Sequence, residues 1–145
     1  MGKNSNNTSA AIGYSDTKVV KYSDLTDAST TQTLTYAVNP GEMISAVGYR
    51  LNTNFDGGAT SELTITIGDG ADADGYIAAS SLHEDATAVP YEANSGALLN
   101  GTTSTFKLYK AADTIDILFT ATGANVSVLD QGEVTIFFDI KRLNA

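Results

Sequence analysis

The sequence predicts an all-β protein: an antiparallel two-sheet sandwich, most simply a jelly roll of about eight strands. Three observations predict it. Apolar residues alternate with polar residues in run after run, β-branched and aromatic residues dominate these runs, and no helix of crossover length separates them. Alternation with a period of two turns one side of each strand toward a core and the other side toward water.

The predicted strands follow one another along the chain and are separated by turn residues. Asn39-Pro40-Gly41 and Asp56-Gly57-Gly58 have turn chemistry, because glycine tolerates positive φ and proline fixes its own φ. Helical candidates are short, such as 23–28, and the longest irregular stretch is 80–100. Strands are expected at 18–22, 33–38, 43–51, 63–67, 76–79, 106–108, 115–120 and 134–140, with an additional candidate at 125–129.

The chain is predicted to hold one folded domain preceded by an arm. Residues 1–16 are polar and small and are expected to form a flexible or extended N-terminal arm, while 17–145 form the β-sandwich domain. The core of that domain is predicted from the inward-facing positions of the strands. It comprises Leu34, Leu63, Ile65, Phe106, Leu108, Ile115, Ile117, Phe119, Ile136 and Phe138.

Composition excludes several classes of partner and site. Lys and Arg number 8 against 17 Asp and Glu, a net charge of −9, so the surface repels nucleic acid phosphates and anionic lipid headgroups. No apolar run approaches the length of a transmembrane helix. Because the chain contains no cysteine, disulfides and cysteine-ligated zinc are excluded. We therefore expect neither a nucleic acid nor a membrane partner.

A glycine-rich stretch after the strand at 63–67 matches the spacing of a dinucleotide-binding loop, Gly68-x-Gly70-x-x-Ala73. Such a loop needs a following helix, because the pyrophosphate binds backbone N–H groups at the N-terminus of that helix. The residues from Tyr76 onward predict a strand instead. Carboxylates within the loop would also repel the phosphates. The stretch is therefore predicted to be a turn between strands.

The acidic residues of the same turn leave a calcium site open as an alternative. Aligning Asp72 and Asp74 with the third and fifth positions of an EF-hand loop puts Gly70 first and Ser81 twelfth, so both of those ligands are missing. A looser carboxylate site formed by Asp69 with these two residues is not excluded. A solvated loop tip is the simpler interpretation, and no cofactor is predicted.

Catalytic residues are not evident in the sequence. His83, the single histidine, stands in His83-Glu84-Asp85, but neither a zinc-binding H-E-x-x-H helix nor a G-x-S-x-G nucleophile elbow is present. His83 is expected on a surface loop, and the protein is not expected to be an enzyme. The seven tyrosines could stack on sugars, although Tyr36 fits a core face. A glycan-binding sandwich is therefore an alternative function.

Two apolar residues interrupt the polar faces of the last two long strands. Leu118 lies between Asp116 and Thr120, and Phe137 lies between core positions of its own strand. If the two strands were antiparallel neighbours, both side chains would project from one side of the sheet. They are candidate subunit-interface residues, together with Ile12 and Tyr14 of the arm.

Three segments resemble small β-rich virion proteins of tailed bacteriophages: VVKYSDLTDASTTQT (19–33), FDGGATSELTITIGDGADADGYIAAS (55–80) and FTATGANVSVLDQGEVTIFFDI (119–140). The similarity covers most of 18–142 and is greatest to the head decoration, or cement, proteins of the capsid exterior. It rests on the order of strand and Gly/Asp turn segments and includes no catalytic motif. Similar-looking sequences also serve at a tail, neck or fibre.

The resemblance implies a jelly-roll or similar sandwich that forms a homo-oligomer, often a trimer. It also implies noncovalent binding over junctions of the major capsid protein lattice on the virion exterior, after synthesis in the host bacterial cytoplasm. The expected function is thus a structural one, stabilisation of the shell. The alternative is a β-sandwich binding module on a phage fibre or tail, or one that recognises cell-surface glycans.

Overall fold

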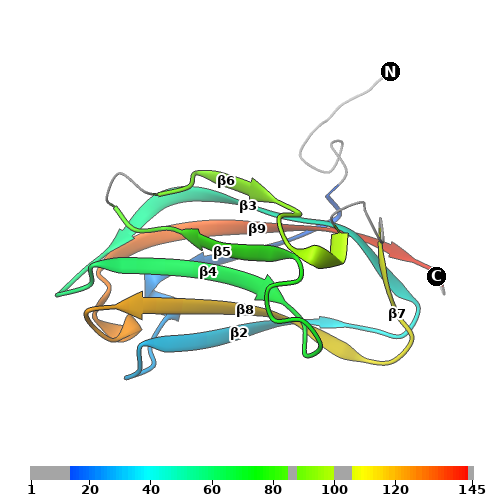
Figure 1. Ribbon diagram of the computed structural model, residues 1–145, viewed down its shortest axis with the longest axis horizontal. Helices are drawn as coiled ribbons and strands as arrows, with labels where there is room; N and C mark the ends of the chain where they lie inside the picture. Colours follow the sequence, from blue (N-terminus) through cyan, green and yellow to red (C-terminus); the bar gives the residue numbers. More distant parts are fainter. Residues whose placement is uncertain (1–13, 85–87, 100–105, 144–145) are drawn as a thin grey trace, which may run out of the picture.

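The computed structural model describes residues 14–84, 88–99 and 106–143, and these form a two-layer β-sandwich (Figure 1). The prediction of an all-β, two-sheet fold is confirmed. Within the described residues no helix is long and apolar enough to cross a bilayer. The described strands are β1 (Asp16–Lys21), β2 (Thr31–Val38), β3 (Glu42–Asp56), β4 (Glu62–Gly68), β5 (Ile77–Ser81), β6 (Tyr91–Ala93), β7 (Lys107–Tyr109), β8 (Asp113–Thr122) and β9 (Gln131–Arg142), with short 3₁₀ helices at Tyr22–Asp24, Ala97–Leu99 and Val126–Val128.

The strand order is that of a jelly roll. In the sheet that we call sheet A the order is β1-β9-β3-β6, and β7 pairs with the first residues of β3, Glu42–Ile44. In sheet B the order is β2-β8-β4-β5. Every pair within the two sheets is antiparallel. Successive described strands lie in different sheets, except for β4 with β5 and β6 with β7, so strand neighbours come from distant parts of the sequence. This wrapping of two Greek keys defines the jelly roll.

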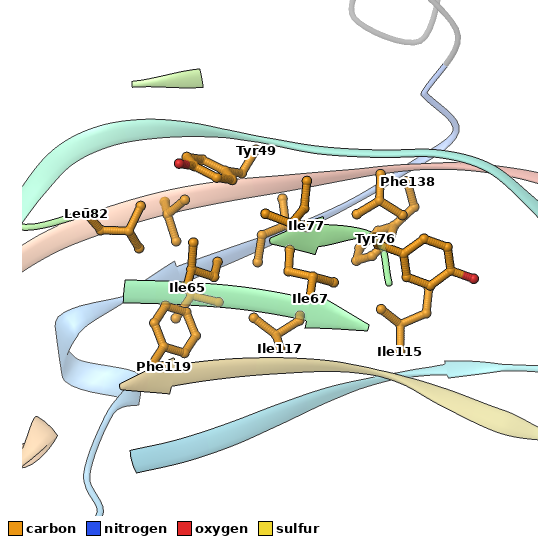
Figure 2. Close-up of a cluster of buried hydrophobic side chains, with 14 of the residues drawn as sticks. Tyr49, Ile65, Ile67, Tyr76, Ile77, Leu82, Ile115, Ile117, Phe119 and Phe138 are labelled. Carbon is orange, nitrogen blue, oxygen red and sulfur yellow. The ribbon is translucent and has the colours of Figure 1, made fainter. Parts of the chain in front are cut away.

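The core fills the space between the two sheets. Ile65, Ile67, Ile115 and Ile117 point from sheet B toward Phe138 of sheet A (Figure 2). Strict alternation in β4 and β8 produces this layer, because every second residue is buried and the residues between them face outward. Of the predicted core, Leu34 is half-buried against the cluster, and seven residues are fully buried: Leu63, Ile65, Ile115, Ile117, Phe119, Ile136 and Phe138.

The predicted orientation of the strand at 106–108 is wrong. Phe106 precedes β7 and is 45% exposed, and Leu108 is only half-buried, opposite Met43. The inward side chain is that of Tyr109, which is 4% exposed. A displacement by one residue reverses both faces of a strand. The reversal is stable here because the hydroxyl of Tyr109 has buried hydrogen-bond partners.

Boundaries differ from the predictions mainly at short elements. β6 was not predicted; it lies in the stretch expected to be irregular and has only three residues. The candidate strand at 125–129 is a 3₁₀ helix, and the helical candidate at 23–28 is a single 3₁₀ turn at Tyr22–Asp24. β1 begins inside the predicted arm. The backbone N–H of Ser15 also donates to the carbonyl of Phe138 at 2.8 Å.

A polar clasp joins the two sheets near the end of β9. Arg142 lies 2.9 Å from the Glu42 carboxylate and 3.4 Å from that of Asp16. The Tyr36 hydroxyl of sheet B donates to Asp16 of sheet A, and the Tyr36 ring stacks on Phe138 at 4.4 Å. Burial and this hydrogen bond raise the pKa of Tyr36 to about 12. We call Asp16, Tyr36, Glu42 and Arg142 the clasp; its contacts connect β1 to β2, β3 and β9.

Candidate functional site

The glycine-rich stretch is a turn between β4 and β5, as predicted, and the following element is a strand. Asp69 and Asp72 exchange backbone hydrogen bonds of 2.9 and 3.2 Å, and the N–H of Gly75 donates to the Asp72 carbonyl at 3.1 Å. Gly68 is required at the start of the turn, because a Cβ there would lie 2.0 Å from the Asp72 carbonyl oxygen. The backbone therefore closes on itself where a phosphate would otherwise bind.

Asp69 points into the protein and organises this turn from within. Its Oδ1 accepts the backbone N–H groups of Ala71 and Asp72 at 3.0 Å, and its Oδ2 accepts the Tyr109 hydroxyl at 2.8 Å. Tyr76 and Tyr109 hydroxyls lie 2.6 Å apart, and Lys107 reaches to within 3.8 Å of Asp69. Burial is the main cause that raises the pKa of both tyrosines. We call these four residues, Asp69, Tyr76, Lys107 and Tyr109, the Asp69 network.

The other two acids of the calcium alternative lie on the solvent side of the turn. Asp74 is exposed and Asp72 is partly exposed. A hydrogen bond with Asp74 is the main cause that raises the pKa of Asp72. Asp69 points inward and holds the turn together, whereas Asp72 and Asp74 face solvent. No group of three or more His, Cys, Asp or Glu side chains is positioned to hold a metal ion in the part of the chain that the structure describes.

The expectation of a surface position for His83 is wrong. His83 is 9% exposed and lies two residues after the end of β5, where it forms an isolated parallel bridge with Phe55. Its Nε2 is 3.4 Å from Oδ1 of Asp56. The ring is thus packed at the junction of β3 with the end of β5.

Leu118 and Phe137 do not share a face. β8 belongs to sheet B and β9 to sheet A, so the antiparallel pairing on which the shared contact depended is absent. Each side chain projects outward from its own sheet, because its neighbours in the strand, such as Ile117 and Phe138, fill the core. The two residues therefore lie on opposite outer faces of the sandwich. Ile12 lies outside the described residues.

The outer face of sheet B carries little charge. Leu118 stands in its middle, between Thr33 of β2 and Thr66 of β4 in the cross-strand register. Charged side chains on this face include Asp116 and Glu62, and Glu62 accepts the Ser81 hydroxyl at 2.7 Å. Threonines supply most of the remaining surface: Thr31, Thr33 and Thr35 of β2, Thr64 and Thr66 of β4, and Thr114, Thr120 and Thr122 of β8. We call this surface the threonine face.

The outer face of sheet A contains a hollow of about 440 Å³. Its walls are the aromatic rings of Tyr14, Tyr91 and Phe137 and the Arg50 side chain, and the backbone carbonyl of Glu92 lies beside Gly48. The Glu92 side chain is on the other face of sheet A, because Glu92 pairs with the buried Tyr49. The Tyr14 and Phe137 rings pack with centroids 5.3 Å apart, and the Arg50 guanidinium lies 5.9 Å from the Phe137 centroid. The structure thus brings together two of the four candidate interface residues.

Gly48 makes the hollow possible. It pairs with Phe137 on one side and with Ala93 on the other, so its missing side chain would point out of sheet A. A Cβ at this position would lie 2.8 Å from the Tyr14 hydroxyl and 3.0 Å from the Glu92 carbonyl oxygen. Only glycine lets the Tyr14 hydroxyl sit directly over the strand.

Sequence reasoning did not identify Gly48, Arg50 or Glu92 as site residues, and it considered Tyr91 only as one of the seven tyrosines. Tyr91 and Glu92 lie on the unpredicted strand β6, which joins the edge of β3. A glycine inside a strand is a known sign of close approach by another group, so Gly48 within the predicted strand 43–51 was an available signal. A tyrosine at position 91 carries no such signal on its own.

Fold and surfaces together define the class of the protein as a jelly-roll β-sandwich with two dissimilar outer faces. No protein family profile matches the chain, and no curated protein is similar to it. Among solved structures, a chain from the "Acidic stable capsid structure of Helicobacter pylori bacteriophage KHP30" is similar at 9% identity and a TM-score of 0.40. The match covers 90% of this chain and 100% of that chain.

Proposed function

We propose that the protein is a structural component of a tailed-phage virion that coats the capsid exterior and stabilises the shell. In this function it binds the lattice of the major capsid protein as a homo-oligomer, with a trimer as the form that the sequence resemblance implies. Several weak contacts per oligomer sum to firm attachment, because each further contact forms within an already tethered complex. No chemical step is required.

The threonine face is the observation that carries this proposal. The chain has a net charge of −9, yet one whole outer face of its sandwich is lined mainly by threonine around Leu118. Centres of protein interfaces are depleted of charged residues and often contain an apolar anchor. The negative charge on the rest of the protein surface suits the outside of a capsid better than its DNA-filled interior. Jelly rolls are also a common architecture of virion proteins.

The first test is the copy number of the protein in purified phage particles. Quantitative mass spectrometry of virions should find it in numbers comparable with the major capsid protein. A few copies per particle, recovered with tails, would contradict capsid coating and favour the alternative of a fibre or tail binding module.

The second test separates the threonine face from the rest of the surface. Capsids that lack the protein are incubated with purified wild-type protein, Leu118→Lys or the matched control Val19→Lys. Val19 is 48% exposed on sheet A, so both variants add one lysine to an outer strand face. Leu118→Lys should fail to bind capsids while the control binds normally. Equal binding of both variants would remove the threonine face from the proposal.

Serine variants of Leu118 and Phe137 test self-association of the protein. Light scattering of Leu118→Ser and Phe137→Ser assigns the oligomer contact to one outer face, now that the two residues are known to lie on opposite faces. We expect Leu118→Ser to dissociate the oligomer while its circular dichroism spectrum stays that of a folded β-protein. Dissociation by Phe137→Ser alone would move the contact to sheet A.

A further inference from the structure

We propose that the hollow on sheet A is a binding site for a small carboxylate that carries an aromatic ring. Its volume of about 440 Å³ is sufficient for such a ligand, since small-molecule sites span roughly 300–1,000 Å³. These sites are mostly apolar and contain a few polar groups that orient the ligand. The proposal does not depend on attachment to a capsid, so it and the proposed function can fail separately.

The aromatic walls of the hollow match the ring of the ligand. Tyr91 is 69% exposed on the edge strand β6 and pairs with Arg50 in the cross-strand register, so both side chains project from the outer face of sheet A. Tyr14 and Phe137 form a second aromatic surface, with ring planes at 52° to each other. A further aromatic ring packs favourably against such surfaces in offset or edge-to-face geometry.

Arg50 supplies the positive charge of the hollow, and its neighbours on sheet A hold it in position. Its Nε donates to Asn52 Oδ1 at 2.9 Å, and Asn52 Nδ2 in turn donates to Glu133 Oε2 and Thr135 Oγ1, each at 2.7 Å. The guanidinium carbon lies 5.9 Å from the Phe137 centroid. Because Asn52 occupies only Nε, the two terminal nitrogens are left for a ligand. A guanidinium binds a carboxylate through two parallel N–H···O hydrogen bonds.

The charge of Arg50 is not compensated by an acid within the hollow. Asp139 of β9 accepts two hydrogen bonds from Lys141 Nζ, at 2.7 and 2.6 Å, and the Glu92 side chain lies on the other face of sheet A. Among the described residues no carboxylate forms an ion pair with Arg50. The chain as a whole carries −9, but charges farther away than about 8 Å are largely screened at physiological ionic strength. The hollow therefore favours an anionic ligand locally.

The test compares three ligands of the full-length protein in solution. Phenylacetate has both the ring and the charge, phenylacetamide has the ring without the charge, and acetate has the charge without the ring. Each is titrated while amide resonances are followed by NMR. We expect phenylacetate to bind most tightly and to shift the amides of Gly48 and Ala93. Arg50→Gln should weaken phenylacetate binding about tenfold or more and leave phenylacetamide binding unchanged.

Two further variants separate the ring contact from the charge contact. Tyr91→Ala should weaken the binding of both ring compounds, because it removes an exposed stacking surface. Arg50→Lys keeps the charge but loses the two parallel hydrogen bonds, so its affinity for phenylacetate should lie between those of the wild type and Arg50→Gln. The amide spectrum of each variant shows whether the fold is retained.

The matched control is Lys110→Gln, which removes the same charge from an exposed lysine that does not line the hollow. It should bind phenylacetate like the wild type. The proposal is overturned if phenylacetate and phenylacetamide bind equally, if Arg50→Gln and Lys110→Gln weaken phenylacetate binding equally, or if no ligand shifts the amides of the hollow. It is also overturned if the Gly48 and Ala93 amides shift with protein concentration alone, because a second copy of the chain would then occupy the hollow.

Discussion

Replacing Asp69 with alanine removes the acceptor on which three hydrogen bonds converge inside the turn between β4 and β5. The carboxylate is 1% exposed and accepts from Ala71, Asp72 and Tyr109 at 2.8–3.0 Å. Since the Tyr109 hydroxyl donates to Asp69, the one hydrogen of the Tyr76–Tyr109 contact comes from Tyr76. The deletion therefore leaves a chain of two buried hydroxyls without its final acceptor.

The expected cost follows from these contacts. A hydrogen bond to a charged group contributes about 1.5–3 kcal/mol, and an unsatisfied buried group costs about 1–3 kcal/mol. The two turn N–H groups can recover part of the loss from water, because Ala71 is exposed, whereas Tyr76 and Tyr109 are 0% and 4% exposed. We expect Asp69→Ala to lower the free energy of unfolding by about 3–5 kcal/mol. Asp69→Asn keeps the volume and one acceptor and should cost about half as much.

Urea unfolding followed by far-ultraviolet circular dichroism measures this difference. Tyrosine fluorescence gives a second probe, because the chain has seven tyrosines and no tryptophan. The control is Asp74→Ala, an exposed acid of the same turn, which should change stability by less than about 0.5 kcal/mol. A loss below about 1 kcal/mol for Asp69→Ala would refute the structural role. A calcium-dependent rise in wild-type stability that Asp74→Ala abolishes would instead support the metal alternative.

Four further predictions concern the core, the clasp and the hollow. Ile117→Ala removes a side chain that is 0% exposed at the centre of sheet B and should cost about 2–5 kcal/mol in urea unfolding, whereas an unchanged midpoint would contradict the core packing. The pKa of Tyr36 is raised from 10.0 to about 12, so its contribution to stability is complete below pH 10 and lost as pH rises toward 12; Tyr36→Phe should remove part of that loss from alkaline unfolding curves. Burial raises the pKa of Asp16, but hydrogen bonds from Tyr36 and Ser15 and the nearby Arg142 outweigh it and lower the pKa below its ordinary 3.8. The contribution of the Asp16 carboxylate to stability is therefore lost only as pH falls below 3.8. Asp16→Asn should make the free energy of unfolding less dependent on pH in acid. Gly48→Ala should displace the side chain over β3 and cost about 1–3 kcal/mol, and normal stability with unchanged β6 amide shifts would show that the strand tolerates a side chain there.

Long regular strands could be predicted from the sequence because their burial is a local pattern. In β4 and β8 every second residue is apolar, and a strand exposes its two faces with that same period. β6 and β7 have three residues each, too few for a pattern to emerge. At β7 the apolar residues Phe106 and Leu108 also pointed to the wrong face. Tyr109 is buried there, and its hydroxyl donates a hydrogen bond to Asp69, which is distant in the sequence.

The error over Leu118 and Phe137 has a different origin. Alternation correctly assigned both residues to the outer faces of their strands, but it carries no information on which strands are neighbours. Two long strands that follow one another in sequence are often paired in a hairpin. In this jelly roll β8 and β9 are joined through Gly123 and a 3₁₀ turn at Val126–Val128 and then enter different sheets. The sheet that a strand joins is set by its contacts with all the other strands, and a short stretch of sequence contains no information on those contacts.

The hollow on sheet A could not be predicted from local patterns, because its residues come from four separate segments of the chain and one of these is the short strand β6. Tyr14 precedes β1, Gly48 and Arg50 lie on β3, Tyr91 on β6, and Phe137 on β9. None of these residues forms a motif with its sequence neighbours. The glycine within β3 is nevertheless informative, because a strand interior disfavours glycine unless another group must approach the backbone. Here that group is the Tyr14 hydroxyl, 2.8 Å from where a Cβ would stand. The glycine is therefore explained by the packing of Tyr14, a residue distant in the sequence, over β3, and the sequence could mark the position but not the group that approaches it.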